Sequence, residues 1–151
     1  MKPYLLTGAL ALALTTTAAA QPRPAASAGL PYTQGPVWTY THVDVKPGQF
    51  DAYISYLSGN WRRAQEAAKR SGDLLDYKVL VVDSPRAGEP DLVLAYQWKN
   101  MAVFDRSPDD IQAQSLGAMN LTPQQATQGS IDREAMRSNM GEITMRELRF
   151  K

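Results

Sequence analysis

Residues 37–57, VWTYTHVDVKPGQFDAYISYL, decide the fold, because two different hydrophobic periods meet there at a single turn. Over residues 37–45, small or β-branched side chains alternate with aromatic or polar ones, and this period of two is typical of a β-strand. Lys46, Pro47 and Gly48 then form a turn. Beyond it, apolar residues recur every three or four positions, which predicts a helix with one buried side, made of Phe50, Ile54, Leu57, Trp61, Ala64 and Ala68.

The two faces of this first strand differ in chemistry. One face carries the small or β-branched residues Val37, Thr39, Thr41, Val43 and Val45. The other face carries Trp38, Tyr40, His42 and Asp44, and His42 is the single histidine of the chain. Since both faces hold β-branched or aromatic residues, we expect both to be covered at least in part.

The remaining elements complete a β-α-β-β-α-β order. Residues 74–83 and 91–99 are predicted to form a hairpin with a long turn. A single helical turn follows at 101–105, and Ser-Pro and Thr-Pro pairs at 107 and 122 predict a broken helical region that ends near residue 140. Residues 142–150 form the last strand. This order predicts an α+β fold of the ferredoxin-like kind, with a four-stranded antiparallel sheet and helices on one face.

Gly59 interrupts the first predicted helix, at a cost of about 1 kcal/mol relative to alanine. A glycine inside a helix is unfavourable, but its lack of a side chain allows another backbone segment to approach the helix at that position. We therefore expect a close backbone approach at this position.

Residues 1–20 have the pattern of a secretory signal peptide. Lys2 precedes a short apolar stretch, and small residues at Ala18 and Ala20 predict cleavage before Gln21. The alternative, a retained membrane anchor, is disfavoured because the apolar stretch is too short to span a bilayer comfortably. We therefore expect an exported protein, periplasmic or secreted, with no membrane association after cleavage. Residues 21–36, rich in Pro, Ala, Gly and Ser, are predicted to be a flexible tether to one domain at 37–151.

Charge and composition exclude several classes of function. The chain has 16 basic and 15 acidic residues, and removal of Lys2 with the leader leaves 15 of each. A neutral domain is a poor partner for nucleic acid, because phosphate binding needs a positive surface. The absence of cysteine and the single histidine leave no cysteine or multi-histidine metal site within one chain. We expect no metal and no cofactor.

Four segments carry a resemblance to a known superfamily. They are VKPGQFDAYISYL at 45–57, LLDYKVL at 74–80, LVLAYQWKNMAVFD at 92–105 and GEITMRELRF at 141–150. The chain resembles the dimeric α/β-barrel superfamily over nearly all of 37–151. It is most similar to small exported proteins of unassigned function, and more distantly to NIPSNAP-like proteins and antibiotic-biosynthesis-type monooxygenases. The resemblance implies a homodimer in which two sheets join face to face and bury Trp38, Tyr40 and His42.

The resemblance also indicates where a ligand would lie. Members that act on substrates usually hold them between the sheet and the helices, and the resemblance implies that the Thr41 side of the first strand faces this cleft. Haem-degrading members use an asparagine on the first strand, a tryptophan, and a histidine on a helix. Here the matching strand position is Thr41 and no predicted helix contains histidine. This departure disfavours haem binding through histidine.

The candidate site residues each have a plain alternative role. His42 has the chemistry of a general base or a ligand, but on an aromatic face we favour a packed residue in the dimer barrel. Asp44 could orient it or be solvated. Tyr40 and Tyr96 are further acid/base candidates. Aromatic residues at such positions more often belong to the core, and with that alternative open we take as ligand-binding candidates Thr41, Trp61 and Trp98.

Three functions remain open. The first is binding of a small, largely apolar molecule in a homodimeric barrel, with no need for catalysis. The second is a cofactor-independent monooxygenase-like reaction on an electron-rich substrate. The third is a non-catalytic structural or interaction module, whose interior should be filled by its own side chains.

Overall fold

The computed structural model describes residues 29–151. The predicted signal peptide and the first part of the predicted tether lie outside these residues. The elements, in chain order, are β1 (Tyr32–Val45), α1 (Phe50–Tyr56), the π-helical turn η1 (Leu57–Trp61), α2 (Arg62–Ser71), β2 (Leu74–Val81), β3 (Leu92–Trp98), the 3₁₀ turn η2 (Met101–Asp105), α3 (Pro108–Met119), α4 (Pro123–Met136) and β4 (Arg137–Phe150).

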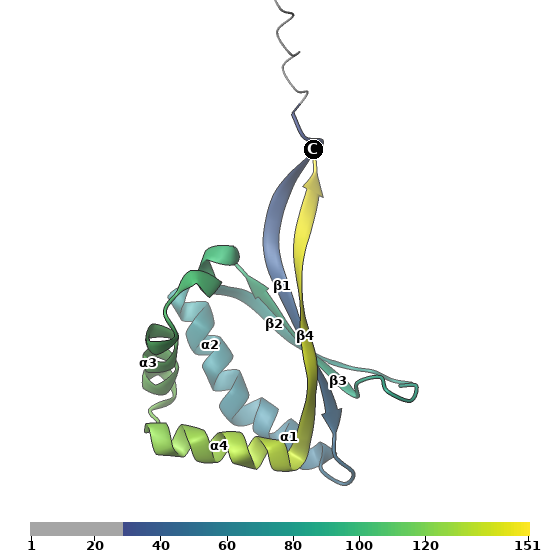
Figure 1. Cartoon of the computed structure of the whole chain (residues 1–151), viewed down its shortest axis with the longest axis vertical. Helices are drawn as coiled ribbons and strands as arrows, with labels where there is room; N and C mark the ends of the chain where they lie inside the picture. The colour runs from purple at the N-terminus through teal and green to yellow at the C-terminus, as the bar shows by residue number, and fades with distance from the viewer. Residues whose placement is uncertain (1–28) are drawn as a thin grey trace, which may run out of the picture. The chain divides into compact units, whose positions relative to one another are not determined.

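The four strands form one antiparallel sheet in the order β2-β3-β1-β4. All the helices lie on one side of this sheet (Figure 1). Because β1 and β2 are both antiparallel to β3, they run parallel to each other, and α1 and α2 make the crossover between them. This is the ferredoxin-like α+β arrangement that the sequence predicts, and that prediction is confirmed.

The core lies between the sheet and the first helical segment. On β1 the helix-facing residues Val37, Thr39 and Val43 are almost completely buried, as the alternation over 37–45 predicts. Opposite them, side chains four residues apart along α1 and η1 pack into the same core. The central cluster consists of Val43, Tyr53, Leu57, Trp61, Leu92 and Leu94.

Strand β1 begins at Tyr32, five residues before the start predicted from the sequence. Residues 32–34 pair with residues 148–150 of β4, whereas pairing with β3 begins only at Val37. Beyond the end of β3, β1 and β4 therefore continue as a two-stranded ribbon (Figure 1). A register shift between Gln34 and Val37 accommodates Pro36, which has no N–H to donate to the ladder. Pairing with β4 thus outweighs the loop-like composition of this segment.

Helix α4 ends at Met136, four residues earlier than predicted, and β4 begins at Arg137. Residues 137–139 pair with residues 43–45 of β1, so strand pairing replaces the last helical turn. Gly141, which follows the helix end predicted near residue 140, instead lies within β4 next to a register shift. Its φ of 111° is in the region that favours glycine, which explains the residue type at this bulge.

The first helical segment is one rod interrupted by the π-helical turn η1, which contains Gly59. A side chain added at Gly59 would meet no atom within 4 Å. The predicted close approach of another backbone is therefore wrong. π-Helical turns shift the side chains that follow them around the helix axis. This one keeps Leu57 and Trp61 both in the core, facing the sheet.

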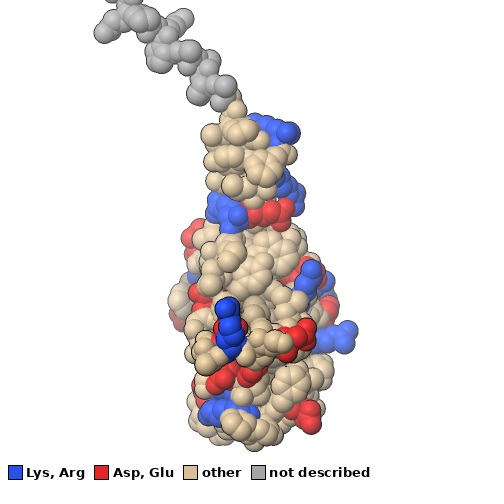
Figure 2. All heavy atoms as spheres, turned by 90° about the vertical axis from the view of Figure 1, so that its right-hand side faces the viewer, with Lys and Arg blue, Asp and Glu red and all other residues tan. Residues whose placement is uncertain are grey.

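The outer face of the sheet is apolar and has no helix over it. Tyr40 lies between Ala95 of β3 and Ile143 of β4, and Trp38 lies opposite Met145. Ile143 and Met145 are 48% and 51% exposed. In Figure 2, which views this side, uncharged residues cover the upper middle of the face, and charged side chains lie along its edges and across its lower part. The prediction that Trp38, Tyr40 and His42 share the face away from the helices is confirmed.

Among the described helices, none combines the length and the apolar character that a membrane crossing requires.

Candidate functional site

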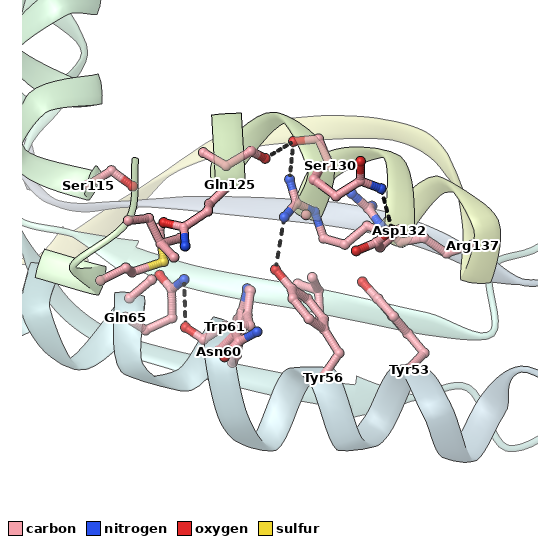
Figure 3. A pocket seen from close by; sticks show the side chains of 18 of the residues that line it. Tyr53, Tyr56, Asn60, Trp61, Gln65, Ser115, Gln125, Ser130, Asp132 and Arg137 are labelled. Carbon is pink, nitrogen blue, oxygen red and sulfur yellow. Dashed lines mark hydrogen bonds between the residues drawn. The ribbon is translucent and has the colours of Figure 1, made fainter. Parts of the chain in front are cut away.

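A cavity of about 590 Å³ lies between the helix-facing side of the sheet and the helices (Figure 3). Its walls come from both halves of the fold: β1 and β3 form one side, the helical elements α1, η1, α2, α3 and α4 form most of the rest, and Leu121 between α3 and α4 and Arg137 at the start of β4 complete it. Small-molecule sites in proteins typically measure about 300 to 1,000 Å³. The cavity therefore has room for a small organic molecule.

Trp61 and Tyr96 form an aromatic wall of this cavity. The Trp61 Nε1–H donates a hydrogen bond to the Tyr96 hydroxyl oxygen at 3.1 Å, and the ring centres are 5.9 Å apart. Because that oxygen accepts from Trp61, the O–H of Tyr96 is free to donate to a ligand. Burial raises the pKa of Tyr96 above its ordinary value. The phenol therefore stays protonated near neutral pH and acts as a hydrogen-bond donor rather than as a base.

Two tyrosines of α1, on the same helical rod as Trp61, extend toward α4 (Figure 3). The rings of Tyr53 and Tyr56 are stacked, with centres 6.0 Å apart. Tyr53 is 1% exposed, and its burial raises its pKa to about 12, against the opposing effect of the Arg137 guanidinium. The hydroxyl of Tyr56 accepts a hydrogen bond from Arg133 Nη1 at 3.3 Å.

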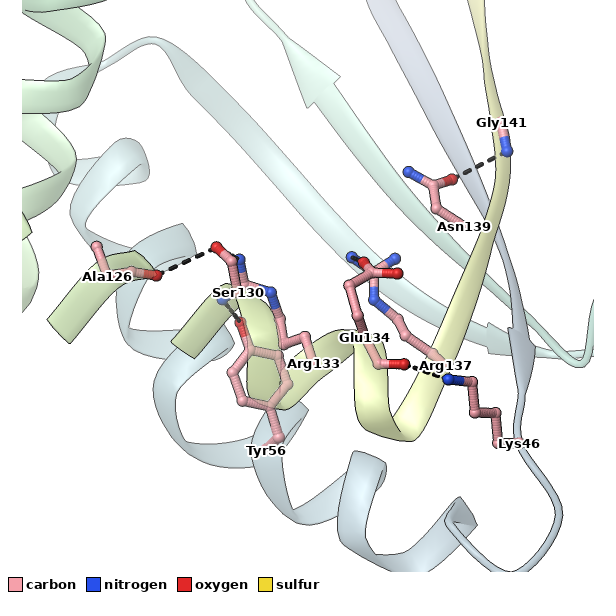
Figure 4. Close-up of polar contacts among 9 residues, drawn as sticks. All are labelled: Lys46, Tyr56, Ala126, Ser130, Arg133, Glu134, Arg137, Asn139 and Gly141. Carbon is pink, nitrogen blue, oxygen red and sulfur yellow. Dashed lines mark hydrogen bonds and ion pairs between the residues drawn. The ribbon is translucent and has the colours of Figure 1, made fainter. Parts of the chain in front are cut away.

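The junction of α4 and β4 supplies two arginines to the cavity (Figure 4). Arg133 Nη2 donates to Ser130 Oγ at 2.7 Å. The Arg137 guanidinium lies 5.9 Å from the centre of the Tyr53 ring, and its Nη2 lies 3.9 Å from Glu134 Oε1. Within residues 29–151 the buried Nε of Arg137 has no hydrogen-bond partner. One end of the cavity is therefore cationic, and the Arg137 guanidinium there forms no hydrogen bond with residues 29–151.

Comparison with known proteins gives weak similarities. No family model matches the chain, and no curated protein matches it in sequence. Among solved structures, SO0527 from Shewanella oneidensis shares 16% identity, with 78% of this chain and 96% of that chain covered and a TM-score of 0.47. HapK from Hahella chejuensis shares 11% identity, with 72% and 90% covered and a TM-score of 0.48.

A third similar structure is a conserved protein of unknown function from Bacteroides thetaiotaomicron VPI-5482, described as a possible oxidoreductase. It shares 13% identity, with 76% of this chain and 100% of that chain covered and a TM-score of 0.44. These three similarities assign no activity to the chain.

The structure brings three of the candidate residues from the sequence together. Thr41, Trp61 and Tyr96 all line the cavity. The hydroxyl of Thr41 donates to Glu142 Oε2 at 2.8 Å, across the β1–β4 pair. Three of the candidate residues, of which the sequence placed only Thr41 at the predicted cleft, thus lie around one space.

The other three candidate residues lie elsewhere. Trp98 lines a second cavity of about 390 Å³ that shares lining residues with the first, and its indole N–H donates to Thr39 Oγ1 at 2.9 Å. Tyr40 and His42 are on the outer face of the sheet, where His42 lies between Val93 and Gly141. Neither residue is among those that line the first cavity.

Sequence reasoning missed the polar half of the cavity. Tyr53, Tyr56 and Asn60 recur at spacings of three and four beside the apolar stripe, which places them along its edge. That spacing was a usable signal. Arg133 and Arg137, four residues apart, were likewise visible, but their position beside the sheet depends on where α4 gives way to β4. Nowhere in residues 29–151 do three histidine or acidic side chains gather closely enough to hold a metal ion.

Proposed function

We propose that the domain binds one small, largely apolar organic molecule in the cavity between the sheet and the helices. The observation that carries this proposal is the unfilled volume of about 590 Å³ beside the aromatic pair Trp61 and Tyr96. A purely structural module would fill such a space with its own side chains, because protein interiors are close-packed. The unfilled cavity therefore favours a binding function over a structural one.

Export and homodimerisation are part of the proposal. The pattern of residues 1–20 supports export to the periplasm or the medium, and the mature protein should begin at Gln21 by mass spectrometry. An exported protein that retains Met1 would contradict this. The apolar outer face of the sheet supports a two-fold dimer, because soluble monomers rarely expose large apolar patches and a two-fold axis covers the same patch on both copies.

A second candidate function is oxygenation of an electron-rich substrate without a cofactor. The free O–H of Tyr96 favours it, because a phenol donor in the cavity would stabilise a developing substrate anion. Tyr40 and His42 lie outside the cavity, so Tyr96 is the acid candidate that lines it. Oxygen uptake with consumption of the bound compound would indicate the enzyme. Binding without consumption would indicate the carrier or sensor.

The test of the binding function uses two substitutions in the same helix. Ala126 of α4 lines the cavity, whereas Ala135 of α4 is exposed. Ala126→Phe should fill part of the cavity and abolish binding of 2-naphthol, a small neutral aromatic compound, as measured by isothermal titration calorimetry. Ala135→Phe adds the same side chain outside the cavity and should leave binding unchanged. Absence of binding to the wild type, or equal binding to both variants, would overturn the proposal.

A further inference from the structure

The cationic end of the cavity has a chemical consequence for the ligand. Arg137 is the first residue of β4 and pairs with Val45 of β1, so the sheet fixes its backbone. The N–H of Lys46 also donates to the carbonyl of Met136 at 3.0 Å, which ties the preceding residue to the β1–α1 turn. The side chain of Arg137 is only 14% exposed. Its guanidinium is therefore held at one end of the cavity and does not extend into solvent.

This guanidinium has more donors than partners. Arginine carries five N–H donors, and a buried donor without an acceptor is costly. Its ion-pair partner is Glu134, at 3.9 Å, a separation that is too long for a hydrogen bond. The Glu134 carboxylate is 63% exposed and therefore well hydrated. In residues 29–151 the buried Nε remains without an acceptor.

The other charged groups near the cavity already have partners. Arg133 donates to Tyr56 and Ser130. Asp132 accepts from Gln128 Nε2 at 2.9 Å, and Glu142 accepts from the Thr41 hydroxyl. Within residues 29–151 no carboxylate thus forms a hydrogen bond with the Arg137 guanidinium, and its two Nη groups, unlike the enclosed Nε, remain available to an anion in the cavity.

We infer that Arg137 binds a carboxylate of the ligand, so that the ligand is an aromatic or similarly unsaturated carboxylic acid. This inference rests on the proposed binding function and names the chemical class of its ligand. The planar fork of the two Nη groups matches the two oxygens of a carboxylate, which a rigid guanidinium binds with two parallel hydrogen bonds. The apolar body of the ligand then lies toward the Trp61–Tyr96 wall, where the Tyr96 O–H donates to a second polar group.

The test uses two probes of the same shape and different charge, 2-naphthoate and 2-naphthamide. We expect the wild type to bind 2-naphthoate more tightly by at least about tenfold, because a charge-assisted pair forms only with the carboxylate. Arg137→Gln should remove this preference and leave the affinity for 2-naphthamide nearly unchanged. Arg70→Gln, which removes an exposed arginine of α2 away from the cavity, is the matched control and should keep the preference.

The outcomes separate the proposal of cavity binding from the inference that the ligand is a carboxylic acid. Equal affinity of the wild type for both probes would overturn the carboxylate inference and leave cavity binding intact. If the wild type binds neither probe, both the carboxylate inference and the proposed binding function are overturned. If the preference for 2-naphthoate survives Arg137→Gln but disappears in Arg133→Gln, Arg133 binds the carboxylate and the inference about Arg137 is wrong. If circular dichroism shows that Arg137→Gln is unfolded, Arg137→Lys keeps the charge but not the fork, and an unchanged preference in that variant would contradict the inference.

Discussion

Tyr53 and Arg137 occupy the same end of the cavity but affect the protein in opposite ways. Tyr53 is buried against the core and keeps its proton because burial penalises the phenolate. Arg137 keeps its charge near that ring, at 5.9 Å, where its attraction to a phenolate partly offsets the effect of burial. The protein thus provides a neutral donor and a cation side by side. An anionic ligand oxygen would be favoured by both groups.

The high pKa of Tyr53 predicts a loss of stability in alkaline solution. An unfolded tyrosine ionises near pH 10, whereas Tyr53 in the folded protein holds its proton to about pH 12. Unfolding therefore releases a proton between these values, and the free energy of unfolding falls as the pH rises through this window, by up to about 2 kcal/mol. Urea unfolding of the wild type and of Tyr53→Phe between pH 9 and pH 12 measures the effect.

Tyr53→Phe should show a smaller fall in stability over this range. A residual fall is expected in that variant, because burial also raises the pKa of Tyr77 and Tyr96. Equal pH dependence in the wild type and the variant would show that Tyr53 is not the buried phenol responsible.

At the scale of elements, the sequence predicts what depends on local periodicity. The alternation over 37–45 predicted the first strand and its buried face correctly, and the three-to-four spacing from Phe50 to Ala68 predicted the helix. Its buried side was predicted only in part, because Leu57 and Trp61 are buried, whereas Phe50 is 44% exposed and Tyr53 lies in the core instead. The strand extension at Tyr32–Pro36 was missed because its composition resembles a loop and only pairing with β4 makes it a strand. The end of α4 was missed for the same reason. Arg137 reaches the cavity only because β4 starts there, so the polar half of the site depends on tertiary pairing.

Two glycines in different elements should respond oppositely to alanine. Gly141 has a φ of 111° in the β4 bulge, a conformation that is strained for any residue with a Cβ. Gly141→Ala should lower the free energy of unfolding by about 1 to 2 kcal/mol. Gly59 lies in η1 with open space around its Cα, so Gly59→Ala should raise that free energy by about 0.5 to 1 kcal/mol.

Urea denaturation followed by tryptophan fluorescence compares the two variants with the wild type. Each glycine serves as the control for the other, since the same methyl group is added in both. A loss of stability in Gly59→Ala would indicate that the π-helical turn requires glycine. A neutral Gly141→Ala would indicate that the bulge does not hold this backbone conformation.

At the scale of the whole molecule, the two faces of the sheet have separate roles in our proposal. The helix-facing side holds the ligand cavity, and the outer side, with Tyr40 stacked beside Trp38 at a ring separation of 6.0 Å, is the proposed dimer surface. The β1–β4 ribbon adds to that surface, because a two-stranded ribbon is only marginally stable alone and Phe150 at its end is 84% exposed. His42 lies on the same outer side of the sheet, where a dimer of the proposed kind would give it a packing role.

Tyr40→Glu tests the proposed dimer directly. In a two-fold dimer built on this face, the new carboxylate would be buried near its own symmetry mate, without a partner of opposite charge, at a cost of several kcal/mol. We expect the dimer dissociation constant to rise by at least about a hundredfold, which sedimentation velocity at micromolar concentration would detect as a monomer. Gln124→Glu adds the same charge on the exposed side of α4 and should leave the dimer intact. A wild type that sediments as a monomer, or a Tyr40→Glu variant that remains dimeric, would show that the outer face of the sheet is not the dimer surface.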